Sequence, residues 1–424
     1  MGAVLGGMIL LAGAALFPTA RVSLAGLRLI FKKEQGGGQL SAFGTLCTTL
    51  AATLGTGNIV GVSSAILLGG PGALFWMVAV SFLCMILKYG ECVLGVRYRR
   101  RGTAGFEGGA FYYIAETLGR KAAKMFAFCG ALAGAMGLGT LTQADGIVRT
   151  LQRHLDPTRQ FSVMGVPLVG LLAAGTVAGL VGAVLCGGLK RISALCEAVV
   201  PLMSVGYILC CGIILIRYAP QAPDALKRIV CDAFSFRAGF GGWVGTVSAG
   251  ISRGIFSNEA GLGSASITAA AAQGDSPHRQ GLIGQAGVFI DTTVMCTLSG
   301  LCVVVTDARG ADGAAVTSAA FGAALGPVGE IAPGIFLCFF AFTTIVGWYY
   351  YAERCFCYLT DGRWERGFRF LYVGMILLTP LMDSSRIWRL ADLLNCGMAL
   401  PNLLALWRLR RQIAAENSQK NTCK

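Results

Sequence analysis

The sequence predicts an all-α protein that crosses a membrane about eleven times, and two observations lead to this fold class. Hydrophobic residues make up 55% of the 424 residues and charged residues only 13%, whereas a soluble domain carries about a quarter charged residues. Apolar runs of about 20 residues, the length that a helix needs to cross a bilayer, recur along the chain. They lie near residues 2–18, 41–69, 72–97, 125–149, 162–189, 192–217, 243–273, 280–306, 332–352, 367–384 and 387–407.

The distribution of lysine and arginine predicts the orientation of these spans. Basic residues cluster at 21–33, 97–101, 120–124 and 408–411, on the side that becomes cytoplasmic under the positive-inside rule. The N-terminus is therefore expected outside and the C-terminus inside, in agreement with an odd number of spans. Because this placement accounts for the net charge of +14, we expect a lipid bilayer and no nucleic acid as partner.

Three short amphipathic segments are expected to lie at the membrane surface rather than across it. The segment 107–124 belongs to the cytoplasmic side by its loop position, and the segments 222–236 and 312–326 belong to the outer side.

Two apolar spans contain glycine clusters that would interrupt a membrane helix. The first reads TLGTGNIVG over 53–61, and the second reads SRGIFSNEAGLGSASITAAA over 252–271. Glycine weakens a helix, and unpaired backbone in hydrocarbon is costly unless it lines a protein cavity. When the first span is set aside, the breaks fall in the first and sixth of ten spans, as expected for two inverted five-helix halves.

This spacing divides the chain into five parts. They are an extra N-terminal transmembrane helix with a basic cytoplasmic loop (1–40), the first five-helix half (41–218), an extracellular amphipathic segment (219–242), the second five-helix half (243–408) and a cytoplasmic tail (409–424).

Two facing breaks are suited to binding a small zwitterion and a cation. Half-helix N-termini favour a carboxylate, and half-helix C-termini with free carbonyls favour a cation. From the residues alone, an alternative stays open in which the small residues only allow helices to pack closely.

Four long blocks of the sequence resemble the sodium:alanine/glycine symporter family. They are ATLGTGNIVGVSSAILLGGPGALFWM (52–77), GIFSNEAGLGSASITAAAA (254–272), VFIDTTVMCTLSGL (288–301) and TTIVGWYYYAERC (343–355). The resemblance implies a LeuT-like core of the APC superfamily and symport of alanine or glycine with sodium by alternating access. It further implies a multi-pass protein of the bacterial plasma membrane, acting as a monomer.

The resemblance also implies a substrate site at the two breaks. Exposed amides at the first break would hold the substrate carboxylate, and carbonyls at the second would hold its ammonium group. Trp348 would limit the size of the side chain, Phe256 would cap the pocket, and Gln143 would hydrogen-bond the substrate. The implied substrate-binding residues are Thr56, Gly57, Asn58, Gln143, Phe256, Ser257 and Trp348.

A sodium site is implied beside the first break. The carbonyls of Ala51 and Leu54 and the hydroxyls of Thr343 and Thr344 would supply its oxygen ligands. From the residues alone, a threonine pair in a membrane helix is instead expected to bond to the preceding turn.

Ionisable side chains within membrane spans are costly and are therefore suspected of function. Asn258, Glu259 and Asp291 are expected to take part in gating or coupling, and Glu91 is a further buried carboxylate of the same kind. Asp145 replaces an asparagine that is usual in the family, and could alter coupling. The favoured alternative is a local pair with Arg149 four residues on.

Other functions are less consistent with the sequence. Proton coupling in place of sodium stays open, and an amino-acid-gated ion channel is the alternative from another class. No HExxH pattern indicates an enzyme, and the 16 cysteines and two histidines show no metal-ligand spacing. We expect sodium as a co-transported ion and no organic cofactor.

Overall fold

The computed structural model describes residues 2–17, 20–32, 37–102, 105–235, 239–274 and 276–418. Helices dominate this part of the chain, and the two short antiparallel pairs β1–β2 and β3–β4 add little to it. The all-α fold class is therefore confirmed.

The elements follow one another in a simple order. They are α1 (Gly2–Leu16), α2 (Gly26–Leu29), α3 (Ala42–Thr53), the π-helical turn η2 (Gly57–Gly61), α4 (Val62–Gly69), α5 (Gly72–Arg97), β1 (Arg100–Gly102), β2 (Gly105–Glu107), α6 (Ala110–Leu118), α7 (Arg120–Met136), α8 (Leu141–Leu155), β3 (Ser162–Val163), β4 (Val166–Pro167), α9 (Leu168–Leu185), α10 (Gly188–Arg217), the 3-10 turn η3 (Ala219–Gln221), α11 (Ala222–Ala233), α12 (Gly239–Asn258), α13 (Ala265–Ala271), α14 (Pro277–Val288), the π-helical turn η4 (Phe289–Cys296), α15 (Thr297–Val305), α16 (Gly313–Leu325), α17 (Pro327–Thr360), α18 (Glu365–Leu378), the 3-10 turn η5 (Thr379–Leu381), α19 (Ser384–Arg408) and α20 (Arg410–Ser418).

The number of membrane spans is lower by length and composition than the sequence predicts. Among the described residues, seven helices are long and apolar enough to cross a membrane, and the bent pair of α3 with η2–α4 makes up to eight. The expected count of about eleven is not confirmed. Three of the expected spans are short or interrupted, because α1 and α18 have 15 and 14 residues and α12 is separated from α13.

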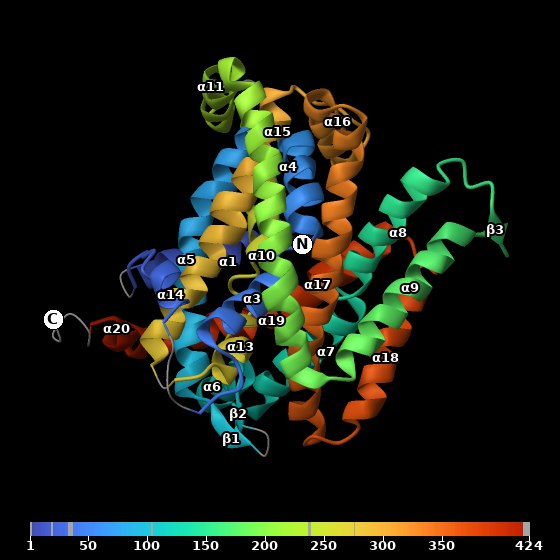
Figure 1. Ribbon diagram of the computed structural model, residues 1–424. Coiled ribbons are helices and arrows are strands. Elements are labelled where there is room, and N and C mark those ends of the chain that lie inside the picture. Colours follow the sequence, from blue (N-terminus) through green and yellow to red (C-terminus); the bar gives the residue numbers. More distant parts are fainter. Residues whose placement is uncertain are drawn as a thin grey trace.

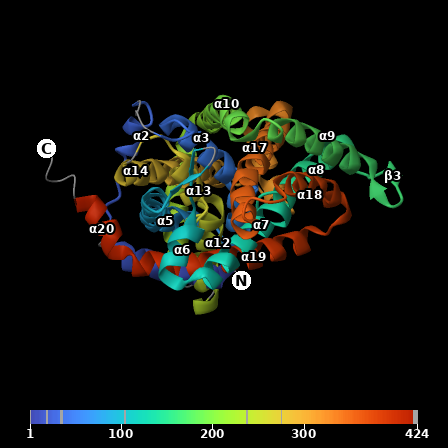
Figure 2. The same ribbon diagram turned by 90° about the horizontal axis from the view of Figure 1, so that it is seen from below.

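The two surfaces of the bundle carry different short elements (Figure 1). The hairpin face carries β1, β2 and α6, and the opposite face carries α11 and α16. Thus the segment 107–124 lies opposite the segments 222–236 and 312–326, in the arrangement that the sequence predicts. Viewed from below, α9 and β3 lie at one edge of the bundle and α20 lies at the other (Figure 2).

The first expected break is present between α3 and η2. The helix axis bends by 56° there, and Leu54 adopts an extended conformation with φ −73° and ψ 92°. The Asn58 side-chain oxygen accepts a hydrogen bond of 3.1 Å from the Gly55 amide. The break therefore satisfies part of its own freed backbone with a nearby polar side chain.

The second expected break separates α12 from α13. Gly261 and Gly263 have positive φ angles of 89° and 81°, and Glu259 has a φ of 56°. Glycine adopts these angles at little cost, whereas a residue with a Cβ is strained there. The glycines at this break are thus required by the path of the backbone.

A third break was not predicted from the sequence. The span expected at 125–149 is interrupted between Met136 and Leu141, so that α7 and α8 are separate helices. A Cβ added at Gly139 would lie 2.6 Å from the Cβ of Trp348. The small residue allows this segment to approach α17 closely.

Helix α12 provides a matched pair of glycines for testing the packing of the bundle. A Cβ on Gly250 would lie 2.2 Å from the Ala73 carbonyl oxygen in α5, whereas a Cβ on Gly245 would meet nothing within 4 Å. We expect Gly250→Ala to destabilise the protein by about 1–3 kcal/mol, because the backbone must shift. Gly245→Ala should leave stability unchanged or raise it. Thermal unfolding in detergent measures both, and equal melting temperatures would contradict the close crossing of α5 and α12.

Candidate functional site

Thr344 on α17 lies at the first break and contacts the end of α3. Its hydroxyl oxygen is 2.9 Å from the Ala51 carbonyl oxygen and 3.0 Å from the Leu54 carbonyl oxygen. It is also 2.9 Å from the carbonyl oxygen of Phe340 in its own helix. A hydroxyl carries one proton and can donate to one of these oxygens at a time. The cluster is therefore rich in oxygen and poor in donors, which suits a cation at a half-helix C-terminus.

Thr343 does not join this cluster. Its hydroxyl donates to the preceding turn, 2.9 Å from the Phe340 carbonyl and 3.2 Å from the Phe339 carbonyl. Successive residues of a helix point about 100° apart, so two neighbouring threonines cannot both face Ala51. Of the expected sodium ligands, the structure brings together Ala51, Leu54 and Thr344, and leaves Thr343 on the side of Met203 in α10.

Gln143 on α8 meets the first break from the other side. Its Oε1 accepts a hydrogen bond of 3.1 Å from the Thr56 amide, and its Nε2 donates to the Leu138 carbonyl. The Thr56 hydroxyl is buried and has no hydrogen-bond partner within the described part of the chain. The break thus presents an amide with a side-chain partner and a hydroxyl without one.

Phe256 on α12 faces the first break. A Cβ on Gly57 would lie 3.3 Å from the Phe256 ring, so the absence of a side chain at Gly57 allows this approach. On its other side the ring packs on Trp388 of α19, with the ring centroids 4.8 Å apart. Phe256 therefore lies between the first break and α19.

A buried network joins the two breaks through Asp291. The Asn58 side chain donates to Asp291 Oδ1 at 2.6 Å and to the Ser257 hydroxyl at 3.0 Å. The Ser257 hydroxyl donates to Asp291 Oδ2 at 2.9 Å. Because Asp291 lies in the π-helical turn η4, the turns η2 and η4 and the last turn of α12 meet at one carboxylate.

The second break is held by two carboxylates. Glu259 accepts hydrogen bonds from the Trp348 indole nitrogen at 2.6 Å and from Ser264 at 3.0 Å. Glu91 on α5 accepts from the backbone amides of Gly261 and Gly263 at 2.7 and 3.0 Å. Trp348 thus ties α17 to the second break, which is a contact that the sequence did not indicate.

Lys88 is a buried ionisable side chain that the sequence predictions do not include. It lies one turn before Glu91 on α5 and is 1% exposed, and its Nζ has no hydrogen-bond partner among the described residues. The Oε2 atom of Glu91 has none either. A lysine in the middle of the apolar run LCMILKYGECVLG was the signal that could have identified it.

The other two polar residues singled out from the sequence bond both to nearby residues and to distant segments, and Asn258 also donates to Thr292 of η4 at 3.1 Å. Asn258 donates to the Gly254 carbonyl at 2.8 Å and accepts from the Ala260 amide at 3.0 Å, so it closes the end of α12. Asp145 pairs with Arg149 at 2.8 Å and also accepts a hydrogen bond from Ser384. The local pairing of Asp145 with Arg149 is thus present.

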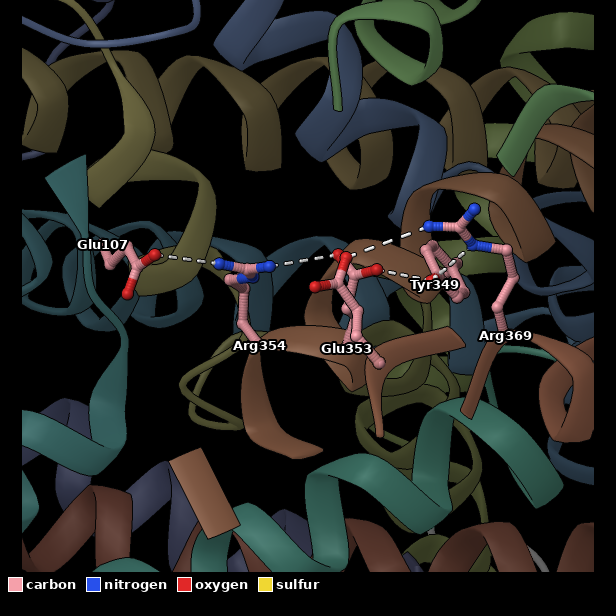
Figure 3. Close-up of polar contacts among 6 residues, drawn as sticks. Glu107, Tyr349, Glu353, Arg354 and Arg369 are labelled. Atoms are coloured by element: carbon pink, nitrogen blue, oxygen red, sulfur yellow. Dashed lines mark hydrogen bonds and ion pairs between the residues drawn. The ribbon is translucent and has the colours of Figure 1, made fainter. Parts of the chain in front are cut away.

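A polar network crosses the hairpin face (Figure 3). Arg354 on α17 lies 3.3 Å from Glu107 of β2 and 3.3 Å from Glu353. Tyr349 donates to Glu353 and accepts from Arg369 of α18 at 3.3 Å. The network therefore connects the hairpin that follows α5 with α17 and α18.

The start of α3 is connected to the same face. The Gln273 amide donates to the Leu40 carbonyl at 2.7 Å, which joins the start of α3 to the end of α13. Arg99 donates to the carbonyls of Ala272 and Gly274 at 3.0 and 2.9 Å. The hairpin-side ends of α3, α5 and α13 are thus linked to one another.

The sequence matches one family over nearly its whole length. A model of the sodium:alanine symporter family matches residues 3–422. An uncharacterized transporter of Haemophilus influenzae is 43% identical, over 96% of this chain and 91% of its own length. The sodium/alanine symporter AgcS of Methanococcus maripaludis is 37% identical, over 98% of this chain and 94% of its own length.

A solved structure shows the same fold. The crystal structure of MhsT in complex with L-phenylalanine matches with a TM-score of 0.63 and 16% identity, over 90% of this chain and 92% of that chain. This likeness confirms the LeuT-like fold that the resemblance implied. The family model and the similarity to AgcS show that the chain belongs to the sodium:alanine symporter family.

Proposed function

We propose that this chain imports alanine or glycine together with sodium by alternating access. The observation that carries the proposal is the cluster of oxygens around Thr344, where the carbonyls of Ala51 and Leu54 lie 2.9 and 3.0 Å from its hydroxyl. When sodium binds, the Thr344 hydroxyl would turn its proton away from these carbonyls. The ion would then have several oxygen ligands and no neighbouring hydrogen-bond donor. Sodium is then a co-transported ion.

The substrate would bind on the opposite side of the same break. Its carboxylate would take the amides of Thr56, Gly57 and Asn58, displacing the Gln143 oxygen from the Thr56 amide, and would accept a hydrogen bond from the free Thr56 hydroxyl. Its ammonium group would face the carbonyls near Phe256 and Ser257. Because the Phe256 ring lies 3.3 Å from the Cβ position of Gly57, the space favours a very small side chain.

We assign the orientation of the chain in the membrane, and the contact that closes its inner side, from the two opposite faces of the bundle. The hairpin face, with the basic cluster at 97–101, would lie in the cytoplasm of a bacterium, with the N-terminus outside and the chain acting as a monomer. The contact of Glu107 with Arg354 would close the inner side. Breaking it would let α3, α5 and α13 move away from α17 and α18.

Proton coupling is the second function, and the buried charges near the second break favour it. Lys88 and Glu91 each present a buried charged atom without a hydrogen-bond partner in the described chain. A proton could be exchanged there in place of sodium.

Uptake into proteoliposomes tests both versions. Labelled alanine and glycine should accumulate when a sodium gradient is imposed, and leucine should compete poorly. Accumulation that follows a pH gradient in the absence of sodium would favour the proton-coupled version. No accumulation under either gradient would contradict symport.

The two threonines provide a matched test of the sodium site. Thr344→Ala should raise the sodium concentration for half-maximal uptake by about tenfold or more, because loss of a ligand costs about 1.5–3 kcal/mol. Thr343→Ala should change it little, because that hydroxyl bonds to its own helix. The measurement is alanine uptake against sodium concentration. Equal effects of the two substitutions would argue against the placement of sodium at Thr344.

The contact between Glu107 and Arg354 provides a test of inner closure. Glu107→Gln should favour the inward-open state and increase the reactivity of Cys47, which is buried in α3 beside α10. The matched control is Glu116→Gln, since Glu116 forms an exposed pair with Arg100 on the same face. Labelling of the Cys47 peptide by a maleimide in inside-out vesicles is read by mass spectrometry. We expect Cys47 labelling to rise several-fold in Glu107→Gln alone. Unchanged labelling in both variants would show that this contact does not keep the inner side closed.

A further inference from the structure

A cavity of about 180 Å³ lies between α12 and α19. It is bounded on one side by Phe256, the ring that also faces the first break. Its lining residues are Ser252, Arg253, Ile255, Phe256, Leu262, Trp388, Asp392 and Asn395.

The Phe256 ring separates this cavity from the first break. On one side it lies 3.3 Å from the Cβ position of Gly57. On the other side it packs on Trp388, which lines the cavity. Shortening the side chain of Phe256 would therefore open this cavity toward the first break.

The lining of the cavity indicates what it could hold. Asn395 is 2% exposed, and its Oδ1 has no hydrogen-bond partner among the described residues. An unpaired buried amide is costly, so a ligand with a neutral N–H donor would be favoured there. Ile255 and Leu262 supply apolar contacts. Arg253, which lies over the Trp388 ring at 5.1 Å, and Asp392 supply opposite charges, which do not favour a ligand with a net charge.

We propose that this cavity is a closed extension of the substrate's side-chain pocket, and that Phe256, supported by Trp388, sets the upper size limit of the substrate. When Phe256 is shortened, the pocket should accept an amino acid with a carboxamide side chain, glutamine or asparagine. Its methylene groups would contact Ile255 and Leu262, and its amide would pair with Asn395. This inference rests on the proposed transport of small amino acids at the first break.

The test compares substrate ratios rather than absolute rates, because Phe256 belongs to the proposed substrate site. In proteoliposomes, Phe256→Ala should raise the ratio of glutamine to alanine uptake by about tenfold or more, which is the range of discrimination set by steric fit in a pocket. Phe128→Ala, which removes a ring that is 56% exposed on α7, is the matched control and should leave the ratio unchanged. Adding Asn395→Leu to Phe256→Ala should remove most of the gain for glutamine.

The outcomes separate this inference from the proposed function. If the unmodified protein accumulates no alanine, the proposed function fails. If it does, and Phe256→Ala shows no gain for glutamine, the extension pocket is wrong while symport stands. Equal gains for leucine and glutamine would overturn the role of Asn395. If Phe256→Ala transports nothing, thermal unfolding in detergent decides, since stabilisation by glutamine supports the pocket and its absence overturns it.

Discussion

The structure depends on how the backbone groups freed at two helix breaks are satisfied inside the bundle. Hydrocarbon offers no hydrogen bonds, so each freed N–H and C=O must find a partner within the protein or a bound ligand. At the second break two carboxylates supply several of these partners. Glu91 accepts hydrogen bonds from two backbone amides, and Glu259 accepts one from the Trp348 indole. At the first break the partners include the Asn58 side-chain oxygen, the Gln143 oxygen and the Thr344 hydroxyl, and we propose that a substrate and a cation replace the last two. On this proposal the two breaks differ, because the protein itself holds the second and ligands bind at the first.

The same contacts link the two proposed binding positions. The Ala51 and Leu54 carbonyls precede the bend in the first break, and the Thr56 amide and hydroxyl follow it. Only a few residues separate them, and Asn58 ties this segment to Ser257 and Asp291. A ligand on one side of the bend therefore restrains the segment that the other ligand must contact. Coupling through the order of a shared segment needs no large displacement in the resting protein.

The features that could be predicted from the sequence are those that depend on residue type in a short window. The glycine clusters at 53–61 and 252–271 predicted both breaks. At the second break Gly261 and Gly263 have positive φ angles, which other residues adopt only with strain. The family resemblance placed Ala51, Leu54 and Thr344 together. The direction of Thr343 followed from its helical phase relative to α3, which depends on tertiary packing.

Other features needed the fold itself. The interruption between α7 and α8 arises where Gly139 meets Trp348 from a distant helix, and the bond of Trp348 to Glu259 joins residues 89 positions apart. No short stretch of the sequence indicates either of these two contacts. The wall formed by Phe256 and Trp388 likewise joins α12 to α19. The resemblance assigned the size limit to Trp348, which stays a prediction, and the proposed extension pocket adds Phe256 as a second limiting ring.

The most direct measurement of the central claim is a pair of binding titrations on the purified protein. Alanine is titrated with and without sodium, and sodium is titrated with and without alanine, with choline keeping the ionic strength constant. Because both ligands restrain the first break, sodium should raise the affinity for alanine by the same factor by which alanine raises the affinity for sodium. We expect this factor to be about 5–150-fold. Equal alanine affinity in sodium and in choline would contradict a shared first break, even if the protein transported alanine.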